Sequence, residues 1–211
     1  MTAIFLSHFI DNNTPIYGGT SDLQFIKTNS SINEGSTSNT LLLTLPNHIG
    51  THIDFPYHFN NSGKKLSDYG ANFWVFNKIG FLECSICEVP VKILDLSVDI
   101  EILVIKTGFG AYRGQDNYWK NQPIFPSSYA QLFKERFPKL RVLGFDLISM
   151  TSKLDREEGK RAHLEFLIEN DILILEDMNL ENISKLEGYI IISPLQISNA
   201  DGAPCSVLNI I

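Results

Sequence analysis

Short apolar runs, separated by polar or glycine-containing segments, recur along the whole chain and predict a protein built mainly from β-strands. Each run is four to seven residues long, which suits a strand better than a helix. We expect strands at 41–45, 81–84, 100–106, 142–146, 172–176 and 189–193.

Helical patterns are fewer. The stretch 127–137 starts with serine after Pro126, has apolar residues at helical spacing, and stops before Pro138. The stretch 156–170 carries Leu164, Leu167 and Ile168 on one side, which predicts a second helix.

The segments between these elements read as connections within one domain. Residues 59–72 and 107–125 are rich in Gly, Asn, Ser or aromatic side chains and are typical of loops that could wall a pocket. No internal repeat, charge block or linker divides the sequence. We therefore expect residues 1–211 to form a single α/β domain with a largely β core.

Composition narrows the class of partner. The formal net charge is −7 and no basic run is dense enough to favour nucleic acid or an anionic membrane, so a small-molecule substrate is expected. No apolar stretch reaches eighteen residues, and the amino terminus lacks a basic region and a small-residue cleavage site, which predicts a cytoplasmic protein. The three cysteines, Cys84, Cys87 and Cys205, are expected to be reduced.

The densest cluster of chemically active side chains lies at even positions between residues 48 and 58. It contains His48, His52, Asp54 and His58, so this segment holds three of the five histidines in the chain. In an extended backbone these side chains share one face, while the odd positions are apolar. Imidazole and carboxylate ligands together favour zinc and other first-row divalent ions over calcium or magnesium.

Geometry requires a bend within this cluster. His48 and His52 would be about 13 Å apart in a straight strand, too far to share an ion, whereas His52 and Asp54 are only about 7 Å apart. Gly50 permits the bend. Pro56 is expected to end ladder pairing and to hold His58 away from the other three residues. The alternative, that these histidines sit on a polar strand face and are satisfied by hydrogen bonds, does not account for their concentration beside an aspartate.

A second pair of candidate ligands lies later in the sequence. His163 is on the predicted helix, and Glu176 closes the apolar run 172–175. A carboxylate at the end of such a strand is costly to bury unless something compensates its charge. Taken alone, each residue also has a purely structural interpretation. His163 could be a half-buried histidine of a helix, and Glu176 could be a solvated residue at the end of a strand. Together with the first cluster they suggest ligands for a second ion.

The motif His48-x-Gly50-Thr51-His52-x-Asp54-x-Pro56-x-His58 resembles the signature of the cyclase-like metal-dependent hydrolases, the superfamily of bacterial kynurenine formamidase and isatin hydrolase. The similarity runs almost from end to end. Supporting segments are 6–8 with 15–17, 105–109, 143–146, and the closing turn 201–204. The resemblance implies a swivelling β/β/α domain that assembles as a homodimer or homotetramer.

The resemblance also implies roles for individual residues. His48 and His52 would bind one divalent ion, Asp54 would bridge two, His163 would bind the second, and Glu176 would touch one or both. His58 would be the general acid and base. Zinc is the first expectation for both ions, and manganese is the alternative.

Several positions depart from the family pattern near the expected substrate pocket. Tyr17 stands where kynurenine formamidases tend to have tryptophan, and Thr20, Thr151 and Ser206 replace an expected aspartate, aspartate and arginine. These departures weigh against N-formylkynurenine itself as the substrate. Candidate residues to pack a flat or aromatic substrate are Tyr17, Phe59, Phe109 and Trp119.

The ligand set suggests a metal-dependent hydrolase that cleaves an amide-type C–N bond in a formamide, lactam or cyclic imide. Ions held in this way lower the pKa of bound water, and the resulting hydroxide would attack a carbonyl carbon while His58 protonates the leaving group. Two alternatives stay open at this point. One is a metal-containing protein that binds a small molecule without turnover, and the other is a lactone hydrolase or cyclase of the same family.

Overall fold

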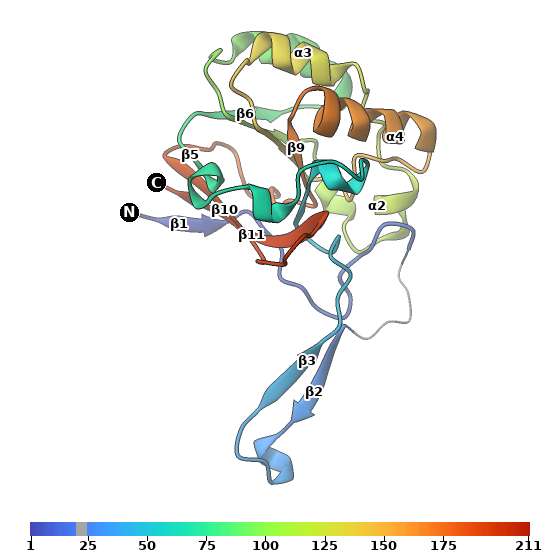
Figure 1. Ribbon diagram of the computed structural model, residues 1–211, viewed down its shortest axis with the longest axis vertical. Helices are drawn as coiled ribbons and strands as arrows, with labels where there is room; N and C mark the ends of the chain where they lie inside the picture. The colour runs from blue at the N-terminus through green and yellow to red at the C-terminus, as the bar shows by residue number, and fades with distance from the viewer. Residues whose placement is uncertain (20–24) are drawn as a thin grey trace.

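The computed structural model describes residues 1–19 and 25–211. Most of the strands in these residues form one large mixed β-sheet (Figure 1). The fold is α/β with a largely β, barrel-like core, as the sequence predicts. Thr20, one of the positions that depart from the family pattern, lies outside the described residues. The strands are β1 (Ala3–Phe5), β2 (Ile26–Ser30), β3 (Thr40–Leu43), β4 (His52–Asp54), β5 (Val75–Phe76), β6 (Ile79–Glu83), β7 (Ile102–Lys106), β8 (Val142–Phe145), β9 (Leu173–Glu176), β10 (Tyr189–Pro194) and β11 (Gly202–Ile210).

The large sheet changes from parallel to antiparallel at its centre. Its strand order is β5-β10-β11-β4-β9-β8-β7-β6, and β1 pairs with β11. Strands β6 to β9 are parallel, whereas β4 pairs antiparallel with both β9 and β11. The residues of β8 and β9 are all buried, which explains why these runs are apolar except for Glu176, the last residue of β9. All six runs predicted as strands form strands, with ends that differ by at most two residues.

Helices α3 (Tyr129–Arg136) and α4 (Arg156–Leu164) lie side by side over one face of the sheet (Figure 1). The side chain of Asp155 caps α4 by accepting a hydrogen bond from the backbone N–H of Glu158 at 2.9 Å. The helix predicted over 156–170 ends its α-helical part at Leu164 and continues as a π-helical turn, Glu165–Glu169. Shorter helices are α1 (Val89–Lys92) and α2 (Asp116–Lys120).

A hairpin of β2 and β3 projects away from the rest of the molecule (Figure 1). Leu41, Leu42 and Leu43 on β3 are 53 to 63% exposed, although their sequence is fully apolar. A two-stranded ribbon has no core of its own, so these leucines find no cover within the described part of the chain. Within that part, no helix is long and apolar enough to cross a membrane.

Candidate metal centre

A bend at the start of β4 brings the first three candidate ligands together. Gly50 has a φ of 59°, in the left-handed region that favours glycine, so the chain turns where the sequence predicts. His52 and Asp54 then point to one face of β4, while Ile53 between them is fully buried. The alternation of a three-residue strand thus separates ligands from core.

Strand register supplies the next ligand. His52 of β4 lies directly opposite Glu176 of β9, so their side chains emerge on the same face of the sheet. On the other side of β4, Asp54 lies opposite Gly202 of β11. A Cβ atom on Gly202 would come within 2.3 Å of Cε1 of His48, so this glycine leaves the space that the His48 ring occupies.

The carboxylates of Asp54 and Glu176 contact the imidazoles of three histidines, His48, His52 and His163. Oδ1 of Asp54 is 2.8 Å from Nδ1 of His48 and 3.5 Å from Nε2 of His52, and Oδ2 is 3.6 Å from Nε2 of His163. Glu176 reaches Nε2 of His52 at 3.2 Å through Oε2 and Nε2 of His163 at 3.7 Å through Oε1. The structure therefore brings together all five residues predicted as ligands.

The outward ring nitrogens of two of these histidines are tied to backbone carbonyls. Nδ1 of His52 donates to the carbonyl of Gly50 at 2.9 Å, and Nδ1 of His163 donates to that of Gly159 at 2.8 Å. Each bond leaves Nε2 facing the carboxylates. Histidines that ligate metals are typically held in this way, because the outer hydrogen bond fixes both ring orientation and tautomer.

Charge is concentrated at the centre in a manner that suits a cation. Burial alone would raise the pKa of Asp54, but hydrogen bonds from His163 and His48 hold it well below its usual range. Despite the opposing effect of burial, the carboxylates raise the pKa of His52 to about 9 and that of His163 to about 10. Asp54 and Glu176 are only 1 and 2% exposed, so their charge must be compensated by protonated imidazoles or by metal. The donor set, carboxylate oxygen with imidazole nitrogen, fits a first-row divalent ion.

The position of His58 corrects one expectation. Pro56 ends the pairing of β4, as predicted, but it begins a tight turn, Pro56–His58, that folds back instead of leading away. The His58 ring consequently lies 4.2 Å from the His48 ring, between centroids, and was wrongly expected to be held apart from it. Nδ1 of His58 is 2.9 Å from Oδ2 of Asp201.

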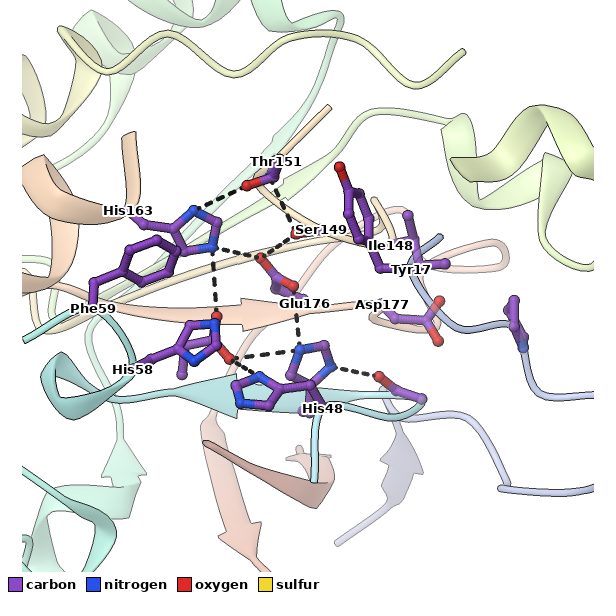
Figure 2. Close-up of a pocket in the computed structure, with 14 residues that line it drawn as sticks. Tyr17, His48, His58, Phe59, Ile148, Ser149, Thr151, His163, Glu176 and Asp177 are labelled. Atoms are coloured by element: carbon purple, nitrogen blue, oxygen red, sulfur yellow. Dashed lines mark hydrogen bonds and ion pairs between the residues drawn. The ribbon is translucent and has the colours of Figure 1, made fainter. Parts of the chain in front are cut away.

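The five candidate ligands and His58 line a pocket of about 360 Å³ (Figure 2). Tyr17 and Phe59 line it, together with Pro15 and Ile148. The Phe59 ring stacks on His163 with centroids 4.5 Å apart. Of the two segments predicted to wall a pocket, 59–72 therefore contributes a residue, whereas 107–125 contributes none to the lining of this pocket.

The other two aromatic candidates lie elsewhere. The Phe109 ring packs against Tyr112 with centroids 5.0 Å apart, and Trp119 lies under Nζ of Lys153, 4.5 Å from its ring centroid. Neither residue lines the pocket. Thr151, one of the departures from the family pattern, does line it, and its hydroxyl is 3.3 Å from Nδ1 of His163.

One protein-family model matches most of the chain. Residues 4–152 match the model of the family Cyclase, described as "Putative cyclase". The chain belongs to the cyclase family. This region contains the bend, β4 and the predicted acid/base histidine of the cyclase-family protein, whereas His163 and Glu176 follow it in sequence.

Individual relatives extend the similarity over nearly the whole chain. The cyclase-family protein is 28% identical to kynurenine formamidase of Geobacillus thermodenitrificans over 216 residues, which covers 95% of this chain and 93% of the relative. Kynurenine formamidase of Bacillus cereus is also 28% identical, with the same coverage. The solved structure of an isatin hydrolase bound to the product analogue thioisatinate has the same fold, with a TM-score of 0.78, 16% identity, and coverage of 99% of this chain and 92% of that one.

Two acidic residues at the site of the cyclase-family protein were not predicted from sequence to be functional. Asp177 lines the pocket and is held by Arg113, whose Nε and Nη2 donate to its carboxylate at 2.9 Å each. Its backbone has a φ of 51°, which is uncommon for a residue with a side chain. Asp201 contacts two histidines of the site. The only sequence signal for Asp201 was its place in the closing turn 201–204, and Asp177 had none beyond following Glu176.

Proposed function

We propose that this cyclase-family protein is a metal-dependent hydrolase that cleaves an amide-type C–N bond of a small, aromatic substrate. It belongs to the arylformamidase-like hydrolases, which act on C–N bonds other than peptide bonds. The observation that carries the proposal is the set of imidazole nitrogens that face two buried carboxylates at the floor of a pocket.

The residues proposed to hold two divalent ions are His48, His52, Asp54, His163 and Glu176. Asp54 is the proposed bridge, because its two oxygens face different histidines. When bound, such ions supply Lewis acidity, which polarises a carbonyl group and lowers the pKa of water. Zinc is the first choice for this mixed nitrogen and oxygen set, and manganese the second.

His58 is the proposed general acid and base. Its side chain is 31% exposed and lines the pocket, so it can exchange protons with a substrate and with solvent. Because Nδ1 faces Asp201, Nε2 is the atom free to take a proton from water and give it to the departing nitrogen.

The side chains that line the pocket indicate the class of substrate. Tyr17, Phe59 and Ile148 give the pocket flat and apolar surfaces, which suit a ring next to the scissile bond. Formamides, lactams and cyclic imides of aromatic compounds fit this description, and the names of the relatives support it. Contact of Phe109 and Trp119 with a substrate stays a prediction.

We also propose that residues 1–211 act as one domain, in the cytoplasm, and as a homodimer or homotetramer. The exposed leucines of β3 support self-association, because a second copy would cover them. Light scattering would measure the mass in solution, and a monomer at micromolar concentration would contradict the assembly.

The function is tested with a panel of aryl formamides, lactams, cyclic imides and aryl lactones. The protein is loaded with zinc or manganese, and a chelated sample is the control. We expect amide cleavage that disappears on chelation and returns when metal is restored. Tight binding without product would instead identify a non-catalytic binder, and preferred cleavage of lactones would identify the other family activity.

A further inference from the structure

One carboxylate oxygen joins the metal centre to the proposed acid/base. Oδ2 of Asp201, at the turn before β11, is 3.0 Å from Nε2 of His48 and 2.9 Å from Nδ1 of His58. The centroids of the two imidazole rings are 4.2 Å apart, and the ring planes are tilted by 32°. Asp201 is not among the residues assigned above as ligands, and its side chain is 34% exposed.

The other oxygen of the Asp201 carboxylate, Oδ1, accepts a hydrogen bond that holds the side chain in place. The side-chain amide of Asn47 donates to Oδ1 of Asp201 at 2.6 Å and to the carbonyl of Gly202 at 3.1 Å. Asn47 directly precedes His48, and the His48 ring rests on Gly202. Oδ1 is therefore occupied, and Oδ2 is the atom left to face the imidazoles.

An ionised carboxylate only accepts hydrogen bonds, so both ring nitrogens that face Oδ2 must carry protons. The consequence differs for the two rings. His48 is left with Nδ1 toward Asp54, on the ligand side, and His58 is left with Nε2 as its proton-exchanging atom.

His48 differs from the other two proposed histidine ligands in the group that anchors its outward nitrogen. His52 and His163 have their outward nitrogens tied to backbone carbonyls, whereas His48 has a carboxylate in the same place. A carbonyl would serve His48 equally well as an anchor, but it could not place a charge against a second imidazole. The carboxylate provides both functions at one atom.

We propose that Asp201 is a positioning residue that sets the tautomers of a metal ligand, His48, and of the acid/base, His58, through its Oδ2 oxygen. The part that concerns His58 rests on the proposed function. The part that concerns His48 needs only a metal site. Loss of Asp201 should therefore reduce metal affinity and turnover together, each by about 10- to 100-fold.

The decisive variant is Asp201→Asn, which keeps size and shape. Because Asn47 donates to the Oδ1 side, the new amide turns its oxygen there and its NH₂ group toward the histidines. An NH₂ group donates, so His58 must give up the proton at Nδ1 and carry it at Nε2. The variant is therefore expected to move the His58 proton from Nδ1 to Nε2, and not only to weaken the contact.

The measurement is long-range ¹H–¹⁵N NMR of the zinc-loaded protein, in which five histidines give few enough signals to assign. We expect the wild type to show protons on Nε2 of His48 and Nδ1 of His58. In Asp201→Asn we expect the His58 proton on Nε2, weaker zinc binding by competition with a chelator, and a lower kcat with KM changed less than about threefold.

Two further variants separate positioning from structural support. Asn47→Ala loosens the turn but keeps the carboxylate, so its tautomers should match the wild type. Asp171→Asn removes a surface carboxylate that pairs with Lys64 and should change nothing. A His58 proton on Nε2 in the wild type would overturn the proposal without any variant, as would wild-type tautomers and zinc affinity in Asp201→Asn. If the wild type fails to cleave any amide, the proposed function fails, but the tautomers and zinc affinity still test Asp201.

Discussion

The floor and the rim of the pocket are built differently. On the floor, His52, Asp54, His163 and Glu176 are at most 5% exposed, and backbone carbonyls orient the imidazoles. On the rim, the side chains of His48, His58 and Asp201 are 23 to 34% exposed, and the Asp201 carboxylate orients the two imidazoles. Backbone carbonyls thus orient two of the histidines proposed to hold cations, whereas one partly solvated carboxylate orients both the third, His48, and the residue proposed to move protons, His58.

The largest effect should come from breaking the floor. In Asp54→Ala, the carboxylate between the three imidazoles is lost, so bound metal should fall toward zero and activity by a factor of more than about 1,000. Elemental analysis measures the metal. Full metal content in this variant would show that Asp54 is not the bridge.

Removing the proposed acid/base from the rim should leave the metal in place. In His58→Ala, amide cleavage should fall by a factor on the order of 100 to 10,000, because the proton donor for the leaving group is gone. Metal content is the control and should equal that of the wild type. Unchanged turnover would remove His58 from the mechanism.

A substitution at Gly202 should displace the ring of His48, which contacts both the buried Asp54 and the more exposed Asp201. In Gly202→Ala, the new Cβ would approach the His48 ring to 2.3 Å, so zinc affinity should fall by about 10- to 100-fold. Gly70→Ala is the matched control, because a Cβ there meets nothing within 4 Å and the backbone has an ordinary φ of −74°. Equal zinc affinities in the two variants would contradict the packing of His48 against β11.

The charge balance of the floor predicts a pH dependence for the metal-free protein. His52 and His163 have pKa values raised to about 9 and about 10, so their stabilising contribution is complete below about pH 6.5, the unfolded pKa, and is lost as pH rises through these values. Between pH 7 and 10.5 the Tm should fall by on the order of 5 to 10 °C. Calorimetry should show a smaller fall with zinc, because the cation replaces the protons. An equal fall with and without zinc would contradict this balance.

The smallest effect is expected from changing Phe59, an aromatic side chain that lines the pocket. Phe59→Leu removes an aromatic ring that stacks on His163, so KM for an aromatic substrate should rise by roughly 3- to 10-fold with little change in kcat. Trp119→Phe is the comparison variant, because Trp119 does not line this pocket, and unchanged constants there would count against its predicted contact with the substrate. A raised KM in Trp119→Phe would instead support the sequence prediction that this residue contacts the substrate.

Local pattern was enough to predict much of this molecule. The runs at 142–146 and 172–176, apolar except for their last residues, form buried parallel strands because both faces of such strands are covered. Gly50 was predicted to bend the chain because ligand spacing required it, and its φ of 59° agrees. These features depend on residues close together in sequence.

Features that depend on distant residues were missed. Strand β11 was not predicted, although it forms the closing part of the sheet beside β4, because Gly202, Pro204 and Asn209 interrupt its pattern. The link between Asp201 and His58 spans 143 positions, and no local periodicity indicates such a contact. Pro56 was interpreted correctly as the end of pairing, but the direction taken by the next turn is set by packing that the sequence does not display.

The three-residue length of β4 has a consequence for assembly of the fold. Because side chains alternate, a slip of one position against β9 would turn Ile53 into the pocket and drive His52 and Asp54 into the apolar interior. Correct alignment of these strands and creation of a cation-binding surface are therefore one event, so an ion present during folding would select the right alignment over its nearest competitor.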